Sequence, residues 1–154
     1  MHDLYHYVEC GLDDVYLENG FERIESARGT SVAIRDIDAL HLVIGDQLCR
    51  HKRELSGKEI RFLRQEMLMS QATLAHLLDV SEQTVHRWET EKTAMRGAAE
   101  SLLRLLYAEH ARGARGRIRN RLQRIADLED ELDHAQEMVF KLMTDKETRW
   151  QLAA

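Results

Sequence analysis

The 154-residue sequence contains no proline, only two cysteines and 6% aromatic residues. The absence of proline favours long, uninterrupted helices, since proline is the residue that breaks them. Two distant cysteines do not form a disulfide framework. No apolar run approaches the length of a membrane span, and the N-terminus lacks a basic-then-apolar signal pattern. We therefore expect a cytoplasmic protein with no membrane partner.

Motifs of enzyme and cofactor sites are also missing. The sequence has no nucleophile–base motif, no Gly-rich phosphate loop and no C-x-x-C pair. We therefore expect neither catalysis nor a cofactor. Cys10 and Cys49 are weak candidates for zinc ligands, since His2 and His6 precede Cys10 at four-residue spacing and His51 follows Cys49. The alternative, which we favour, is buried free cysteines with exposed histidines and no metal.

The net charge of −5 is distributed unevenly along the chain. Residues 1–49 hold 3 basic and 10 acidic side chains, residues 50–124 hold 16 and 9, and residues 125–154 hold 3 and 8. The middle segment is therefore at +7, between segments at −7 and −5. A local excess of positive charge is what contacts with nucleic-acid phosphates require.

Two short helical patterns lie next to each other in residues 70–89, S-Q-A-T-L-A-H-L-L-D-V-S-E-Q-T-V-H-R-W-E. Each opens with a serine, Ser70 or Ser81, that can cap a helix. Apolar residues follow on one face at three- and four-residue spacing. Only two residues separate the patterns, so the second helix must turn sharply against the first. The small Ala75 allows the two backbones to approach closely.

This stretch resembles the helix-turn-helix of the lambdoid phage repressor and Cro class, and the resemblance extends from Ser56 to about Tyr107. It implies a homodimer that binds double-stranded DNA. The residues on its base-reading positions are Gln71, Glu82, Gln83, Thr84 and Arg87. The resemblance also implies a buried ion pair between Arg64 and Glu89. The function expected from it is a sequence-specific transcriptional regulator, acting as an autoregulating repressor.

Phosphate contacts are expected from side chains around the motif. The candidates are Ser70, Ser81, Arg50, Lys52, Arg53, Lys92 and Arg96. Two positions depart from the family pattern. The usual turn glycine is Asp79, which tolerates a left-handed backbone at some cost. The usual Asn-Gly after the second helix is Thr90-Glu91, which we expect to weaken the helix stop.

Residues 1–52 predict a small acidic module with β-structure. Asn19-Gly20 is the dipeptide typical of a β-hairpin, here over residues 15–25. A third short strand is expected over 30–35, followed by a helix, capped by an aspartate, that runs to about His51. Such a module is too small to be very stable alone. It must pack on the next domain, bind a protein partner or hold a metal.

This order of parts is similar to that of the antitoxins and regulators of the MqsA family, which bind zinc through two C-x-x-C pairs that this sequence lacks. The resemblance implies an alternative function. In that alternative the chain is a type II antitoxin, whose N-terminal module binds a toxin and whose helix-turn-helix regulates its own operon.

The expected fold is mainly α, with a five-helix domain over residues 53–112 and a long helix over 113–154. In that helix, apolar residues recur with the spacing of a coiled-coil seam: Ile118, Leu122, Ile125, Leu128, Leu132, Ala135, Val139 and Leu142. Basic residues precede acidic ones, which opposes the helix macrodipole. An antiparallel partner helix would compensate for this order. The alternatives are arginines that reach DNA phosphates and a helix folded back on its own domain.

Overall fold

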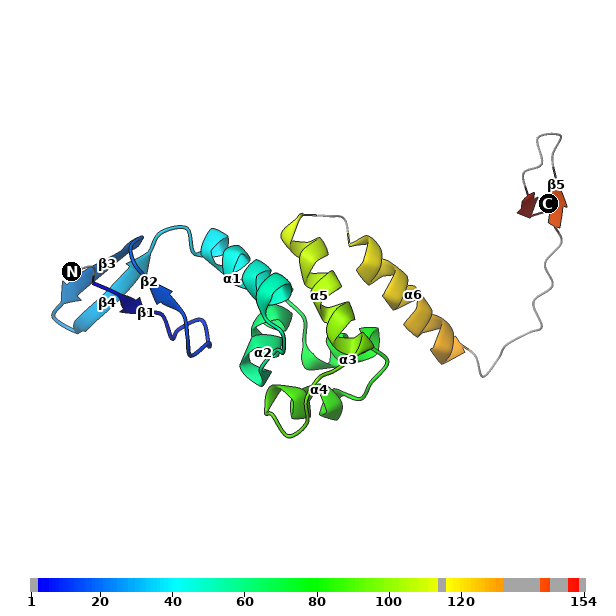
Figure 1. Cartoon of the computed structure of the whole chain (residues 1–154), viewed down its shortest axis with the longest axis horizontal. Coiled ribbons are helices and arrows are strands. Elements are labelled where there is room, and N and C mark those ends of the chain that lie inside the picture. The colour runs from blue at the N-terminus through cyan, green and yellow to red at the C-terminus, as the bar shows by residue number, and fades with distance from the viewer. Residues whose placement is uncertain (1–2, 114–115, 132–141, 145–149, 153–154) are drawn as a thin grey trace.

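The computed structural model describes residues 3–113, 116–131, 142–144 and 150–152 (Figure 1). The strands are β1 (Tyr5–His6), β2 (Tyr16–Leu17), β3 (Phe21–Ser26), β4 (Gly29–Ile34), β5 (Leu142–Thr144) and β6 (Trp150–Leu152). The helices are α1 (Ile37–His51), α2 (Gly57–Glu66), α3 (Gln71–Leu77), α4 (Glu82–Glu89), α5 (Ala98–Ala111) and α6 (Arg117–Glu131). The prediction of a mainly helical chain with a small β-containing N-terminal module is confirmed.

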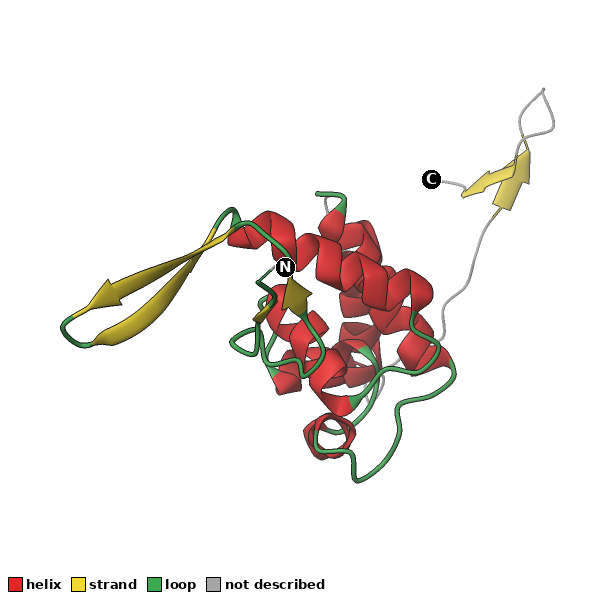
Figure 2. Ribbon diagram, turned by 60° about the vertical axis from the view of Figure 1, so that its left-hand side comes forward, coloured by secondary structure: helices red, strands yellow, loops and turns green. Residues whose placement is uncertain are grey.

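The two hairpins of the N-terminal module differ from the predicted one. β1 pairs with β2, and β3 pairs with β4. The hairpin expected across Asn19-Gly20 is therefore wrong, because this dipeptide joins two strands that do not pair with each other. Gly20 has a φ of 79°, and its carbonyl accepts a hydrogen bond from the Arg35 amide at 2.8 Å. The turn thus separates β2 from β3. Strand β3 pairs with β4 in a hairpin that stands away from the helices (Figure 2).

Helix α1 begins as the sequence predicts. The Asp36 carboxylate accepts a hydrogen bond from the Ala39 amide at 3.2 Å, and the helix ends at His51. Its buried Gly45 lies against the ring of Tyr107 on α5, where a Cβ would stand 2.1 Å from Cζ of Tyr107. The missing side chain of Gly45 is therefore what allows α1 and α5 to pack closely.

Residues 53–112 hold four helices rather than the expected five, because residues 90–97 connect α4 to α5 through turns. Their apolar faces meet in one core, in which the largest fully buried side chains are Tyr107, Ile60, Leu63, Leu74, Leu103 and Val85. Leu12 of the N-terminal module belongs to the same core. The module therefore packs on the helical domain.

Helix α6 folds back on α3 and α5 (Figure 1). The chain reverses at Gly113, where φ is 64°, and the Glu109 carboxylate accepts a hydrogen bond from the Ile118 amide at 2.9 Å. A side chain of α5 thereby caps the first turn of α6. Of the alternatives for this helix, folding back on its own domain is the one that the structure shows.

This packing divides the predicted coiled-coil seam. Ile118 and Leu122 pack against the core, whereas Ile125 and Leu128 are 55% and 43% exposed. The seam positions Leu132, Ala135 and Val139 lie outside the described residues. Leu142 belongs to strand β5, which pairs with β6, so the expected helix does not extend through it.

Replacing Leu68 with glycine should stabilise the chain. Leu68 follows α2, is 91% exposed and has a φ of 56°. A left-handed backbone costs an L-residue about 1–2 kcal/mol, and glycine avoids this cost. Part of the gain is cancelled, because glycine has more conformational freedom in the unfolded chain. We expect Leu68→Gly to raise the free energy of unfolding by about 0.5–1 kcal/mol in urea denaturation. Leu68→Ala, which keeps the strain, is the control. A glycine variant no more stable than the alanine variant would contradict this.

Candidate nucleic-acid interface

Serine side chains cap both helices of the motif. The Ser70 hydroxyl accepts a hydrogen bond from the Thr73 amide at 3.0 Å, and the Ser81 hydroxyl accepts one from the Thr84 amide at 3.1 Å. These bonds satisfy amides that have no partner within the helix. The sequence prediction of two serine-capped helices is confirmed.

The turn between α3 and α4 is tight. Asp79 has a φ of 53°, and the Val80 amide donates to the Ala75 carbonyl at 3.0 Å. Ala75 is 3% exposed, so no larger side chain fits there without displacing a neighbour. An aspartate thus holds the left-handed position that a glycine usually takes.

The expectation that Thr90-Glu91 weakens the end of the second helix is wrong, because α4 has a well-defined end. The helix ends at Glu89, and Glu91 adopts a left-handed backbone with a φ of 59°. The Glu91 carboxylate accepts a hydrogen bond from the Gly57 amide at 3.0 Å, at the start of α2. This tertiary hydrogen bond helps offset the strain and fixes the end of α4 against α2.

A buried network of hydrogen bonds holds the end of α4 against α2 and α3. The Arg64 guanidinium donates from Nε to Glu89 Oε1 at 2.5 Å and from Nη2 to Oε2 at 3.1 Å. Its Nη1 donates to the Met69 carbonyl at 2.7 Å. The Gln71 amide donates to Glu89 Oε2 at 2.7 Å. The side chains of Arg64 and Glu89 are only 9% and 4% exposed, so this network links α2, α3 and α4 inside the domain.

The outer face of α4 presents polar side chains to solvent. Val85 and Trp88 are buried, while Glu82, Gln83 and Arg87 are exposed. Thr84 is half-buried, and its hydroxyl lies 2.8 Å from that of Ser81. The structure thus brings Glu82, Gln83 and Arg87 together and leaves Thr84 at the edge of the face.

His86 is exposed on the same face and was missing from the sequence prediction. It follows Glu82 by four residues and Gln83 by three, which is the spacing of neighbours on a helix surface. Helical periodicity alone could have identified it.

The basic side chains among the candidate phosphate contacts fall into two groups. Arg53, Lys92 and Arg96 are exposed. Arg50 and Lys52 are instead engaged in ion pairs: Arg50 Nε lies 2.7 Å from Asp46 Oδ1, and Lys52 Nζ lies 2.8 Å from Glu59 Oε1. The hydrogen bond to Glu59 also raises the pKa of Lys52. Arg50 lines a groove between α1 and α5.

The cysteines and histidines considered for zinc do not form a cluster in the described part of the chain, where no group of three possible ligands occurs. His2 lies outside that part. The Cys10 thiol donates to the Tyr7 carbonyl at 3.2 Å, and burial raises its pKa. Burial also raises the pKa of the Cys49 thiol to about 11. Both effects oppose the thiolate form that zinc requires.

The Cys49 thiol should react slowly with thiol reagents. A rise in pKa from 9.0 to about 11 lowers the thiolate fraction near neutral pH about 100-fold, and the thiolate is the reactive form. We expect the Cys10→Ser variant to react with a disulfide reagent at pH 8 at least about 100-fold more slowly when folded than in urea. The folded rate should rise as the pH approaches 11. Equal rates for folded and unfolded chains would contradict the burial of this thiol.

The comparisons with known proteins agree with the geometry of the motif. The model of the family described as Helix-turn-helix matches residues 60–97, from the first turn of α2 to the residue before α5. No curated protein and no solved structure matches the chain. Within the described part, no helix is both long and apolar enough to cross a membrane. The matched residues include both serine-capped helices and the Arg64–Glu89 ion pair, and they form a helix-turn-helix of the XRE type.

Proposed function

We propose that this chain is a sequence-specific transcriptional regulator that places α4 in the major groove of its operator. The observation that carries the proposal is the exposed polar face of α4. The Arg64–Glu89 ion pair fixes the opposite, buried side of this helix. Glu82, Gln83 and Arg87 all have hydrogen-bonding groups that can reach base edges. A fixed position of α4 is important for this function, because hydrogen bonds to base edges form only when these side chains are held at the right place.

Arg87 and Gln83 are the base readers that we propose. Arginine pairs bidentately with guanine, and glutamine pairs with adenine, in the major groove. Glu82 accepts a hydrogen bond from cytosine or repels wrong sequences. His86, on the same face, is a further base contact. In this proposal Gln71 positions Glu89 and touches DNA only with the part of its amide that faces away from that carboxylate.

Phosphate contacts would come from residues around the exposed face of α4. Arg53, Lys92 and Arg96 are exposed cations, and the serine-capped starts of α3 and α4 present amides that favour an anion. Such contacts fix the register of the protein on DNA without reading its sequence. We further propose that the chain acts as a homodimer on a two-fold site, with half-sites about 34–36 Å apart, and that it represses its own gene.

Arg87→Ala and Lys92→Ala should weaken DNA binding in different ways. Loss of a bidentate base contact costs about 1–3 kcal/mol and relaxes specificity at one position. Loss of a phosphate contact weakens binding to all sequences alike and lowers the salt slope by about one. The measurement is fluorescence anisotropy with an operator selected from random duplexes, and with its point variants, at several salt concentrations. An Arg87→Ala protein with unchanged base preference would sink the assignment of this residue.

An antitoxin role remains the second candidate, and the β3–β4 hairpin is the observation that favours it. The hairpin stands away from the body, and Ile24 on it is 49% exposed (Figure 2). A protein partner would cover this residue. If the role is right, a neighbouring gene encodes a product that is toxic alone and is neutralised by the chain but not by its Ile24→Asp variant. If wild type and the Ile24→Asp variant both neutralise the toxin, the toxin does not bind through Ile24. If no neighbouring gene encodes a toxic product, the antitoxin role is excluded.

A further inference from the structure

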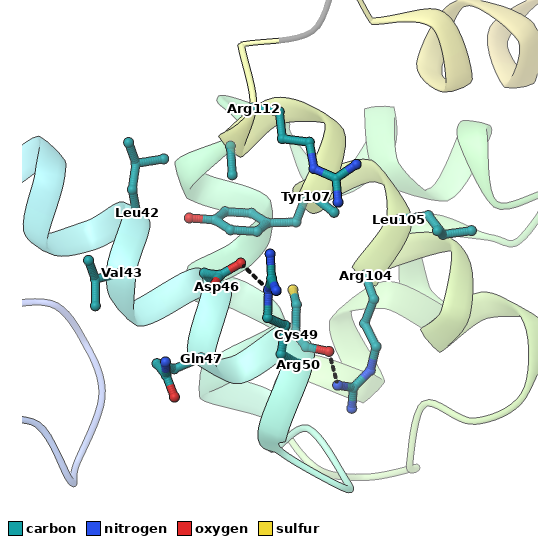
Figure 3. A pocket seen from close by; sticks show the side chains of 12 residues that line it. Leu42, Val43, Asp46, Gln47, Cys49, Arg50, Arg104, Leu105, Tyr107 and Arg112 are labelled. Atoms are coloured by element: carbon teal, nitrogen blue, oxygen red, sulfur yellow. Dashed lines mark hydrogen bonds and ion pairs between the residues drawn. The ribbon is translucent and has the colours of Figure 1, made fainter.

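A groove of about 720 Å³ runs between α1 and α5 on the outside of the domain (Figure 3). Sites that bind small molecules typically measure about 300–1,000 Å³. The walls of the groove are aliphatic: Leu42, Val43 and Leu105 are 39%, 60% and 51% exposed. Tyr107 forms part of its floor, where Gly45 lets the two helices approach. Exposed apolar side chains that gather in a hollow of this size mark a binding surface.

Three arginines line the groove, and they differ in how far the chain itself satisfies them. Arg104 donates to two carbonyls at the end of α1 and to the Glu100 carboxylate. Arg50 is bonded to Asp46 through Nε alone, at 2.7 Å, and its side chain is 61% exposed. The Arg112 guanidinium has no hydrogen-bond or ion-pair partner among the residues that the structure describes. Arg50 and Arg112 therefore keep N–H donors for a bound molecule, whereas Arg104 is engaged within the chain.

The two arginines with free donors come from opposite walls of the groove. Arg50 lies in the last turn of α1, and Arg112 directly follows α5 (Figure 3). Asp46, the single acid of the lining, offsets the charge of Arg50, and Glu100 offsets that of Arg104. The positive charge that remains in the groove is therefore that of Arg112. A molecule that complements this lining is apolar along its body and carries a single negative charge at one end.

We propose that the α1–α5 groove binds a small organic anion that joins a carboxylate to an aliphatic chain, as a fatty acid does. The carboxylate accepts hydrogen bonds from Arg112 and from the Nη groups of Arg50, since a guanidinium presents paired donors that match a carboxylate. The aliphatic chain covers the exposed apolar walls and removes them from water. A polyanion such as a nucleotide fits this lining less well, because only one positive charge is not offset. The site goes beyond the proposed regulation of transcription and adds a small-molecule ligand to it.

Isothermal titration calorimetry of the full chain with decanoate, below its micelle concentration, tests this site. Wild type should bind decanoate saturably, with one molecule per chain. Arg50→Gln/Arg112→Gln should bind it at least about tenfold more weakly, the change expected when hydrogen bonds to a charged group are lost. Val43→Asp should have an effect of similar size, because it places a negative charge on the apolar wall at an exposed position. Arg28→Gln/Arg35→Gln, at exposed positions of the β3–β4 hairpin, is the charge-matched control and should bind like wild type.

Two further probes separate the parts of the ligand. Decanol has the same aliphatic chain without the carboxylate, so it should bind wild type more weakly than decanoate does. It should also bind wild type and Arg50→Gln/Arg112→Gln equally, which shows that the walls of the groove are intact in that variant. Acetate, which has the carboxylate without the chain, should give no measurable binding.

The other outcomes each overturn the inference. Equal decanoate affinity in wild type and Arg50→Gln/Arg112→Gln would mean that these arginines do not hold the carboxylate. Equal affinity in wild type and Val43→Asp would place the aliphatic chain outside the groove. No saturable binding to wild type, together with a dimer that Val43→Asp dissociates in sedimentation equilibrium, would show that a second copy of the chain covers this surface instead. The titrations contain no DNA, so they do not depend on the reading of bases by Arg87.

Discussion

Arg64→Ala should lower the free energy of unfolding by roughly 3–5 kcal/mol, the largest effect that we expect from a single substitution. Removing the guanidinium leaves the Glu89 carboxylate buried with only the Gln71 amide as a described partner, and it also strips the Met69 carbonyl of its donor. A buried charge without its partner costs far more than the intact pair contributes. Glu89→Ala should be similarly costly, because it strands the guanidinium of Arg64.

A variant in which both partners are replaced completes the comparison. Arg64→Met/Glu89→Leu removes both charges together, and its stability should lie closer to wild type than that of either single variant. Arg61→Ala is the matched control, since Arg61 is exposed on the same helix and should change stability by no more than about 0.5 kcal/mol. Urea denaturation of wild type and the four variants measures these differences. Single variants within about 1 kcal/mol of wild type would mean that water reaches this ion pair.

Gly57→Ala should cost about 3 kcal/mol and weaken DNA binding as well. A Cβ at this position would stand 2.4 Å from the Glu89 carbonyl oxygen and 2.7 Å from that of Trp88. Both are backbone atoms at the end of α4, so they cannot rotate away as a side chain could. The strain must therefore move α4 or α2, and with α4 the side chains that we propose to read bases.

The loss in Gly57→Ala is steric, because alanine keeps the amide that donates to Glu91. Gln65→Ala, at an exposed position on the same helix, is the control and should leave both stability and DNA binding unchanged. Thermal unfolding and anisotropy with the same operator measure the two effects. Unchanged operator affinity in a destabilised Gly57→Ala protein would show that the reading position of α4 does not depend on this contact.

Local signals in the sequence predicted local structure well. The Ser56 hydroxyl accepts from the Glu59 amide at 3.2 Å, and the Ser56 amide donates to the Glu59 carboxylate at 2.7 Å, a reciprocal cap that needs only two residues three positions apart. The aspartate cap of α1 and the serine caps of α3 and α4 follow from the same kind of local signal. These features need only residues within one helical turn of each other, and for that reason a single sequence contains them.

Features that depend on distant residues were not predictable. Asn19-Gly20 favours a hairpin, but the pairing of β2 with β1 depends on a strand ten residues earlier. Glu91 holds a left-handed backbone because of a hydrogen bond to Gly57, which no local rule anticipates. The apolar spacing in α6 could not show that Ile118 and Leu122 pack on the chain's own domain.

Base readout by α4 is tested by fluorescence anisotropy with DNA from upstream of the chain's own gene. Wild type and Gln83→Ala/Arg87→Ala are compared on that duplex and on a scrambled one, at two salt concentrations. We expect wild type to prefer its own upstream DNA, and the double variant to lose that preference while keeping salt-dependent binding to both duplexes. Equal preference in the two proteins would contradict readout by the exposed face of α4.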